Sequence, residues 1–163
     1  MRSLLFVPGD SERKLEKSLS SGADAIVVDL EDSVPEVRKS TARGLAAEFA
    51  TMCRARTPRP RIVVRINGPN SADWPADLAA VMRAPPDAVM LPKPRNGADV
   101  TRLAGALSRC ERDHGHTDGT TRILAIATER SAIARRCVGV APRVRLAKTG
   151  AQPGGSMITK KVT

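Results

Sequence analysis

The stretch Ala25-Ile-Val-Val-Asp-Leu-Glu-Asp32 decides the fold, because four consecutive apolar residues lead directly into three carboxylates. Successive side chains of a strand point to opposite faces of its sheet. A strand that is apolar at consecutive positions is therefore covered by protein on both faces, which is typical of parallel sheets flanked by helices. The stretch predicts a buried parallel strand with an acidic carboxyl end.

The same pattern recurs along the chain. Apolar, strand-like runs lie at residues 3–7, 25–30, 61–66, 88–91 and 123–127, and helix-like stretches separate them. This alternation predicts an α/β fold with one parallel sheet. The turn Pro8-Gly9-Asp10-Ser11 matches neither a dinucleotide-binding nor a Walker loop, which excludes both of these nucleotide-binding classes.

The polar residues at the strand ends favour a barrel over an open sheet. A (β/α)₈ barrel takes its catalytic groups from the carboxyl ends of many strands, whereas an open sheet gathers them at one switch point. Here four successive strands end in polar residues: Glu31 and Asp32, then Arg65 and Asn67, then Lys93, then Glu129. A full barrel takes about 200–250 residues. For 163 residues we expect a partial TIM (β/α)₈ barrel of about five to six parallel strands with outer helices.

Charge divides the chain in two. Residues 1–130 hold all 17 acidic residues against 20 of the 27 Lys and Arg, whereas residues 131–163 hold seven basic residues and no acid. We therefore predict a partial β/α barrel over residues 1–130 and a basic, divergent tail over residues 131–163. Phe6, Phe49 and Trp74 are the only aromatic residues apart from two histidines, so bases have little to stack on, and we expect no specific nucleic-acid binding.

The chain carries no apolar run of the roughly 20 residues that a membrane helix needs, so we expect no membrane span. Its first residues lack the pattern of a secretory signal. Three widely spaced cysteines fit reduced thiols better than disulfides or a zinc site. Together these features predict a cytoplasmic protein.

Five motifs resemble the citrate lyase beta subunit-like family, which is part of the HpcH/HpaI aldolase superfamily. They are Arg2-Ser-Leu-Leu-Phe-Val-Pro-Gly9, Gly22-Ala-Asp-Ala-Ile-Val-Val-Asp-Leu-Glu-Asp-Ser-Val34, Val64-Arg-Ile-Asn67, Met90-Leu-Pro-Lys93 and Ile123-Leu-Ala-Ile-Ala-Thr-Glu129. The resemblance covers about residues 1–130. It implies a TIM-barrel lyase that cleaves or forms carbon–carbon bonds in a CoA thioester of the citryl-, malyl- or citramalyl-CoA type, with Mg²⁺ and as a homo-oligomer.

The resemblance also implies roles for single residues. Arg65 would hold the carboxylate of a small 2-oxo acid, since a guanidinium can grip a carboxylate with two parallel hydrogen bonds. Glu129 would bind the substrate through Mg²⁺, which prefers oxygen ligands. Glu31, Asp32 and Lys93 stand at the barrel mouth as candidate catalytic residues.

Simpler interpretations remain open for each candidate. Arg65 could pair with an acidic neighbour in the Asp29 to Asp32 segment, and Glu31 and Asp32 could orient Arg65 or cap the following helix. Lys93 could be a solvated loop lysine. Asn67 fits a role in the turn with Gly68 better than a role in the chemistry.

The C-terminal part departs from the family pattern. The second metal carboxylate is expected in a segment resembling Gly-Ala-Glu-Asp-Leu, where this chain has Gly150-Ala-Gln-Pro-Gly154. We interpret the chain as truncated or frame-shifted, with doubtful activity, and we expect strand one and the last strand to carry unpaired edges. Two alternatives are a competent lyase completed across a homo-oligomer and a noncatalytic interaction module that uses the basic tail.

Overall fold

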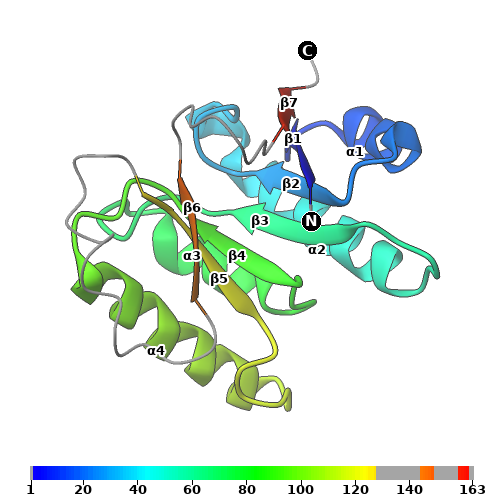
Figure 1. Ribbon diagram of the computed structural model, residues 1–163. Coiled ribbons are helices and arrows are strands. Elements are labelled where there is room, and N and C mark those ends of the chain that lie inside the picture. Colours follow the sequence, from blue (N-terminus) through cyan, green and yellow to red (C-terminus); the bar gives the residue numbers. More distant parts are fainter. Residues whose placement is uncertain (1, 128–143, 149–157, 162–163) are drawn as a thin grey trace.

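The computed structural model describes residues 2–127, 144–148 and 158–161. In these residues the chain forms one parallel sheet of seven strands in the order β6-β5-β4-β3-β2-β1-β7, with helices between the first five strands (Figure 1). The elements are β1 (Ser3–Pro8), α1 (Glu12–Ser18), η1 (Leu19–Ser21), β2 (Ala25–Asp29), η2 (Glu36–Arg38), α2 (Lys39–Arg54), β3 (Arg61–Arg65), α3 (Trp74–Val81), β4 (Ala88–Leu91), α4 (Gly97–Asp113), β5 (Arg122–Ala127), β6 (Val144–Lys148) and β7 (Ile158–Lys161). The α/β fold with a partial parallel barrel is confirmed, although the sheet of the described residues has seven strands rather than the five to six expected.

Local sequence signals set several element boundaries. Gly22 takes the left-handed conformation, with φ of 69°, that ends η1. The side chain of Asn96 accepts hydrogen bonds from the amides of Ala98 and Asp99 and so caps the start of α4. These two residues therefore define the end of η1 and the start of α4.

The basic part of the chain contributes the two outer strands of the sheet. β6 pairs with β5, and β7 pairs in parallel with β1 from Ser3 opposite Ile158 to Phe6 opposite Lys161. The expectation that strand one has an unpaired edge is therefore wrong. Its backbone groups are bonded on both sides, which an apolar run alone does not reveal.

The strands bury both faces, as their consecutive apolar residues predict. One set of side chains, including Val28, Val64 and Leu91, packs with helix residues in the larger core cluster. The alternate set forms a second cluster, comprising Leu4, Ala25, Val27, Val63, Met90 and Leu124, against which Phe6 packs. Asp29 follows Val27 by two residues and Arg65 follows Val63 by two, so both lie on this second face at the carboxyl end of the sheet.

Register brings the carboxyl ends of neighbouring strands together. Asp29 of β2 is paired in register with Arg65 of β3. The amide of Gly9 donates to the Asp29 carbonyl at 2.9 Å, and the amide of Leu30 donates to the Arg65 carbonyl at 2.9 Å. The loops that follow β1, β2 and β3 therefore begin side by side.

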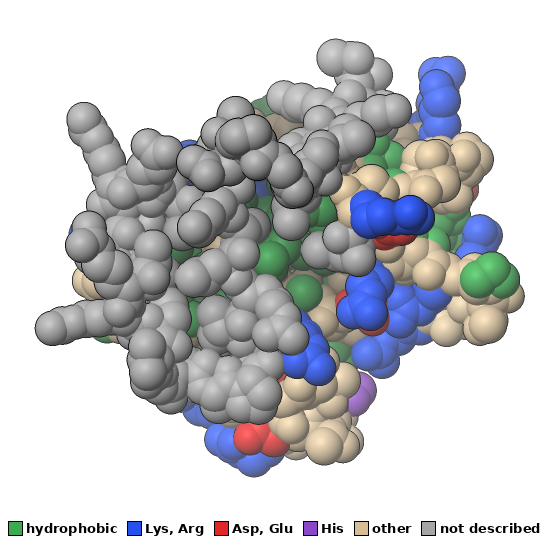
Figure 2. Space-filling model, in the orientation of Figure 1, with side chains coloured by type: hydrophobic (Ala, Val, Ile, Leu, Met, Phe, Trp, Pro, Cys, Tyr) green, Lys and Arg blue, Asp and Glu red, His purple; other side chains and the backbone are tan. Residues whose placement is uncertain are grey.

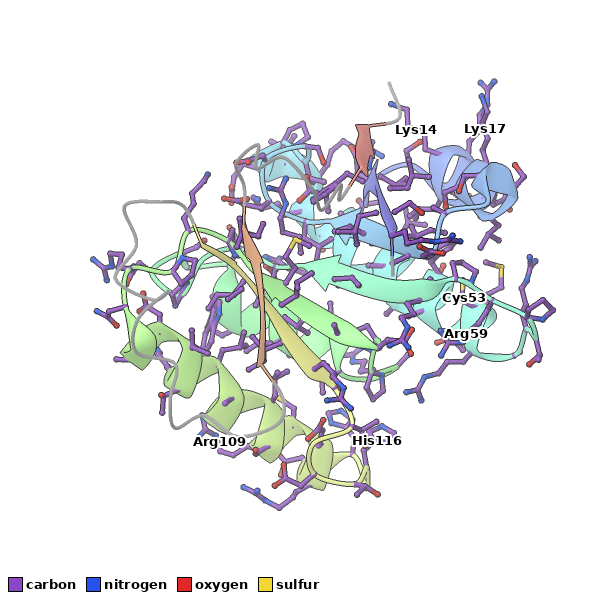
Figure 3. All side chains as sticks on the ribbon, viewed as in Figure 1. Lys14, Lys17, Cys53, Arg59, Arg109 and His116 are labelled. Carbon is purple, nitrogen blue, oxygen red and sulfur yellow. The ribbon has the colours of Figure 1, made fainter. Side chains whose placement is uncertain are left out.

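The opposite end of the sheet carries its own ion pair. Arg59 holds Asp87 with two hydrogen bonds of 2.6 and 2.8 Å, and Asp87 also accepts the amide of Ile62 at 2.7 Å. Figure 3 shows Arg59 beside Cys53 near the start of β3. In β/α barrels the amino-terminal face serves stability rather than catalysis, so this pair acts as a clamp between β3 and β4.

The visible surface matches the basic composition. On the face shown in Figure 2, Lys and Arg side chains cover more of the described surface than acidic ones. Among the described residues, no helix has both the length and the apolar content to cross a membrane.

Gly9 supplies a test of the packing that positions the carboxyl end of β2. A Cβ atom at Gly9 would lie 2.9 Å from the Asp29 carbonyl oxygen and 2.9 Å from Leu30 Cδ2. We expect Gly9→Ala to lower the free energy of unfolding by about 1–3 kcal/mol, measured by urea denaturation. Gly44→Ala is the matched control, because a Cβ there meets nothing within 4 Å and helix α2 should gain about 0.5–1 kcal/mol. Equal effects of the two variants would contradict this account.

Candidate functional site

The centre of the site is an ion pair between β2 and β3. Arg65 Nε lies 2.7 Å from Asp29 Oδ1, and Nη2 lies 2.6 Å from Oδ2. The Asp29 side chain is 2% exposed. Asp29 also accepts the amides of Glu31 and Ser33 and the Ser33 hydroxyl. This carboxylate is thus fully occupied, and it holds one edge of the guanidinium.

A second layer of charges surrounds the free end of the guanidinium. Arg65 Nη1 lies 3.1 Å from Glu31 Oε2 and 3.3 Å from Asp32 Oδ2, while Lys93 Nζ lies 2.9 Å from Glu31 Oε1 and 3.2 Å from Asp32 Oδ1. Each carboxylate therefore bridges the two cations with separate oxygens. We call Asp29, Glu31, Asp32, Arg65 and Lys93 the rim cluster.

The contact between Arg65 and Glu31 is ionic rather than a well-aligned hydrogen bond. Glu31 Oε2 is buried and makes no hydrogen bond to any residue that the structure describes, although Nη1 is 3.1 Å away. The Asp29 contacts are both shorter and bidentate, which makes them the stronger hold on Arg65. Glu31 is consequently the easier partner for a ligand to displace.

Phe6 fixes the plane of the guanidinium. The Arg65 Cζ atom lies 5.3 Å from the centroid of the Phe6 ring, which is a cation–π distance. Phe6 comes from β1, Asp29 from β2 and Arg65 from β3. Residues of three adjacent strands therefore orient Arg65. Phe6 contacts the face of the guanidinium, and Asp29 contacts its edge.

The pairing shifts the pKa values of three groups. Burial opposes ionisation of Asp29, but hydrogen bonds from Arg65 and Ser33 outweigh it and hold the pKa of Asp29 below its usual range. Burial likewise opposes the charge on Arg65, but bonding to Asp29 raises the pKa of Arg65. Hydrogen bonds to Glu31 and Asp32 raise the pKa of Lys93. Lys93 is therefore a cation at neutral pH rather than an amine nucleophile or base.

The structure brings four of the five predicted site residues together. Arg65, Glu31, Asp32 and Lys93 contact one another in the rim cluster, whereas Glu129 lies outside the described residues. Arg65 does pair with its acidic neighbours, and Glu31 and Asp32 do contact Arg65. Among the described residues, the contacts of Glu31 and Asp32 are with Arg65 and Lys93, which supports an orienting role over helix capping.

Two features of the site go beyond what the sequence predicts. Asp29 was expected only as one member of the acidic segment that could pair with Arg65, and the structure makes it the main partner. Asn67, expected to serve the turn, is 5% exposed and bonds instead to the Leu30 carbonyl and to Asp77. The sequence does place Asp29 on the same face of the sheet as Arg65, because Asp29 lies two residues after Val27 and Arg65 lies two residues after Val63. No local signal identifies the partners of Asn67.

The described residues do not make up a magnesium site. They contain no group of three or more His, Cys, Asp and Glu side chains placed to hold a metal ion. The carboxylates of Glu31 and Asp32 are already engaged by Arg65 and Lys93. The metal ligand predicted from the sequence, Glu129, is not among these residues.

Comparison with known proteins identifies the protein family. Residues 2–135 match the family model described as HpcH/HpaI aldolase/citrate lyase. The chain belongs to this family. The resemblance inferred from the five motifs is confirmed, and citrate lyase beta subunits are among the relatives.

Three relatives show how far the similarity extends. The citrate lyase subunit beta of Haemophilus influenzae is 34% identical over 167 residues, which cover 94% of this chain and 57% of that protein. The (3S)-malyl-CoA thioesterase of Cereibacter sphaeroides is 40% identical over 63% of this chain and 35% of its own length. The crystal structure of CitE from Mycobacterium tuberculosis with magnesium, acetoacetate and coenzyme A is 30% identical, with a TM-score of 0.58, over 78% of this chain and 39% of that one. This family member thus spans 35% to 57% of the length of these curated relatives.

Lys93 supplies a test of strain in the rim cluster. Its backbone φ of 44° is in the left-handed region, which costs a residue with a Cβ about 1 kcal/mol or more. Lys93→Ala and Lys93→Gly lose the same two ion pairs, but only glycine relieves the backbone. We expect Lys93→Gly to be more stable than Lys93→Ala by about 1 kcal/mol in urea denaturation. Identical midpoints for the two variants would show that no strain is held there.

Asp29 should make stability depend on pH. Because its pKa is lower folded than unfolded, it stabilises the fold above its unfolded value of about 4, and the contribution is lost as pH falls through the folded value. We expect the free energy of unfolding of the wild type to drop as the pH falls below about 5. Asp29→Asn should be less stable at pH 7 and show a shallower drop, measured by urea denaturation at each pH. Parallel curves for the two proteins would exclude this role of Asp29.

Proposed function

We propose that the chain is a carbon–carbon lyase or aldolase acting on a CoA thioester of the citryl-, malyl- or citramalyl-CoA type. The observation that carries the proposal is Arg65, which Asp29 and Phe6 hold in one orientation while its Nη1 end faces displaceable carboxylates. Family membership and the malyl-CoA thioesterase relative support the CoA thioester. CitE with acetoacetate and coenzyme A supports a small oxo acid as the second ligand.

The geometry indicates how Arg65 would receive a carboxylate. Asp29 occupies the Nε–Nη2 edge, so a ligand must approach the end formed by Nη1 and Nη2. An incoming carboxylate would replace the contacts of Nη1 with Glu31 and Asp32 at 3.1 and 3.3 Å. Lys93 keeps both displaced side chains near the site through its own contacts.

The proposed reaction needs one proton acceptor. In cleavage of a β-hydroxyacyl-CoA, the hydroxyl proton leaves, and the carbonyl forms as the bond between the hydroxyl carbon and the thioester α-carbon breaks. The electron pair of that bond remains on the thioester as an enolate that takes up a proton. Within the rim cluster, Glu31 and Asp32 are the carboxylates that a ligand on Arg65 would release, so we assign them the hydroxyl proton.

Mg²⁺ dependence, cytoplasmic location and homo-oligomer formation are further parts of the proposal. CitE was crystallised with magnesium, and such an ion would polarise the keto oxygen of the oxo acid. Glu129 remains its predicted ligand. We favour an enzyme over a basic interaction module, because the tail segments Val144–Lys148 and Ile158–Lys161 are strands of the sheet.

A lyase assay tests the proposal. We expect the purified chain to cleave malyl-CoA or citramalyl-CoA with Mg²⁺ present, and EDTA to remove the activity. Arg65→Met should lower kcat/KM at least about a hundredfold, because the carboxylate loses its oriented donor. Arg61→Met is the matched control, since Arg61 lies at the other end of the same strand and is exposed. Failure of the wild type to release an oxo acid from either thioester, or full activity of Arg65→Met, would refute the proposal.

A further inference from the structure

A buried lysine contacts the loop that follows β2. Lys39, the first residue of α2, is 8% exposed. Its Nζ donates to the Leu30 carbonyl at 3.0 Å and to Asn67 Oδ1 at 2.8 Å. Both acceptors are uncharged. A buried ammonium is costly to desolvate, and the two neutral hydrogen bonds together with the Coulombic attraction of the Asp73 carboxylate offset part of that cost.

The lysine is one end of a polar chain that runs from α2 to α3. Asn67 Nδ2 donates to the Leu30 carbonyl at 3.1 Å and to Asp77 Oδ2 at 2.7 Å, and the Asn67 amide donates to the same oxygen at 2.7 Å. Asp77 is fully buried and accepts Arg43 Nε at 2.8 Å. Asn67 is thus held from two sides, by Lys39 and by Asp77.

Leu30 connects this series of polar side chains to the rim cluster. Leu30 stands between Asp29 and Glu31 in the sequence, and its amide donates to the Arg65 carbonyl at 2.9 Å. Its carbonyl accepts both Lys39 and Asn67. Leu30, which joins Asp29 to Glu31, is therefore bonded through its amide to β3 and through its carbonyl to Lys39 and Asn67.

We propose that Lys39 is a positioning residue that sets the orientation of Glu31 and Arg65 through Leu30 and Asn67. The consequence for ligand binding rests on the proposed function. Loss of Lys39 would remove one bond from the residue between Asp29 and Glu31 and would leave the buried Asn67 Oδ1 without its donor. The role that we test is therefore the geometry that Lys39 imposes on the loop after β2, separated from its contribution to folding by a control in the same helix.

The test compares Lys39→Met with a variant that loosens the same helix elsewhere. Phe49→Leu is that control, because Phe49 is a buried core residue of α2 and has no part in the polar chain. The first readout is the ¹⁵N–¹H signal of Arg65 Nε, assigned by its loss in Arg65→Lys, together with its hydrogen-exchange rate. The second is the affinity for pyruvate in the presence of Mg²⁺, measured by calorimetry.

We expect Lys39→Met to shift the Arg65 Nε signal, to accelerate its exchange about tenfold and to weaken pyruvate binding about tenfold, since small displacements of positioning groups have large effects. Phe49→Leu should leave both readouts within about twofold of the wild type. Lys39→Gln keeps a donor and should fall between the wild type and Lys39→Met. If Lys39→Met does not fold, Lys39→Gln takes its place in the comparison.

Two results would overturn the role of Lys39: an unchanged Arg65 Nε signal in the substituted protein, or equal changes in Lys39→Met and Phe49→Leu. Failure of the wild type to bind pyruvate would count against the proposed function alone. The Arg65 Nε signal would still decide the role of Lys39, because that measurement needs no ligand. The two proposals can therefore fail separately.

Discussion

The bidentate pair of Asp29 and Arg65 is the interaction on which the described site depends. It joins β2 and β3 at their carboxyl ends, and the Asp29 carboxylate is almost fully buried. Removing either partner would leave a buried charge without compensation, which is far more costly than losing an exposed ion pair. Glu31, Asp32 and Lys93 take their positions from this pair, because each contacts Arg65 directly or through a shared carboxylate.

The sequence predicts the sheet and the rim well, for a physical reason. Strands covered on both faces must be apolar at consecutive positions, so β1 to β5 stand out as short runs. Parallel strands end at the same edge, so the polar residues that follow them, including Glu31, Arg65 and Lys93, were expected together. Family resemblance added roles that spacing alone does not supply, and the role of Glu129 stays a prediction.

What the sequence does not predict depends on long-range register and side-chain direction. The pairing of β7 with β1 joins segments about 155 positions apart, and the short run Ile158–Lys161 has no pattern that selects this partner. Lys39, Arg43 and Asp77 look like ordinary exposed charges of two helices. The burial of Lys39 and Asp77 and the partial burial of Arg43 follow from the packing of α2 and α3 against the loops after β2 and β3, which no local pattern specifies.

The occupied edge of Arg65 also constrains which ligands the site accepts. A carboxylate that reaches Arg65 finds the Nε–Nη2 edge already taken and must bind the Nη1–Nη2 end, in competition with Glu31 and Asp32. The rim cluster holds three acidic and two basic side chains that pair with one another. A neutral molecule would break these ion pairs without forming new ones, so it would gain little binding free energy by displacing them. A compact anion replaces one ionic contact with another and leaves Glu31 and Asp32 paired with Lys93. Under the proposed function, selectivity for small acids would follow from this exchange of ion pairs at Arg65.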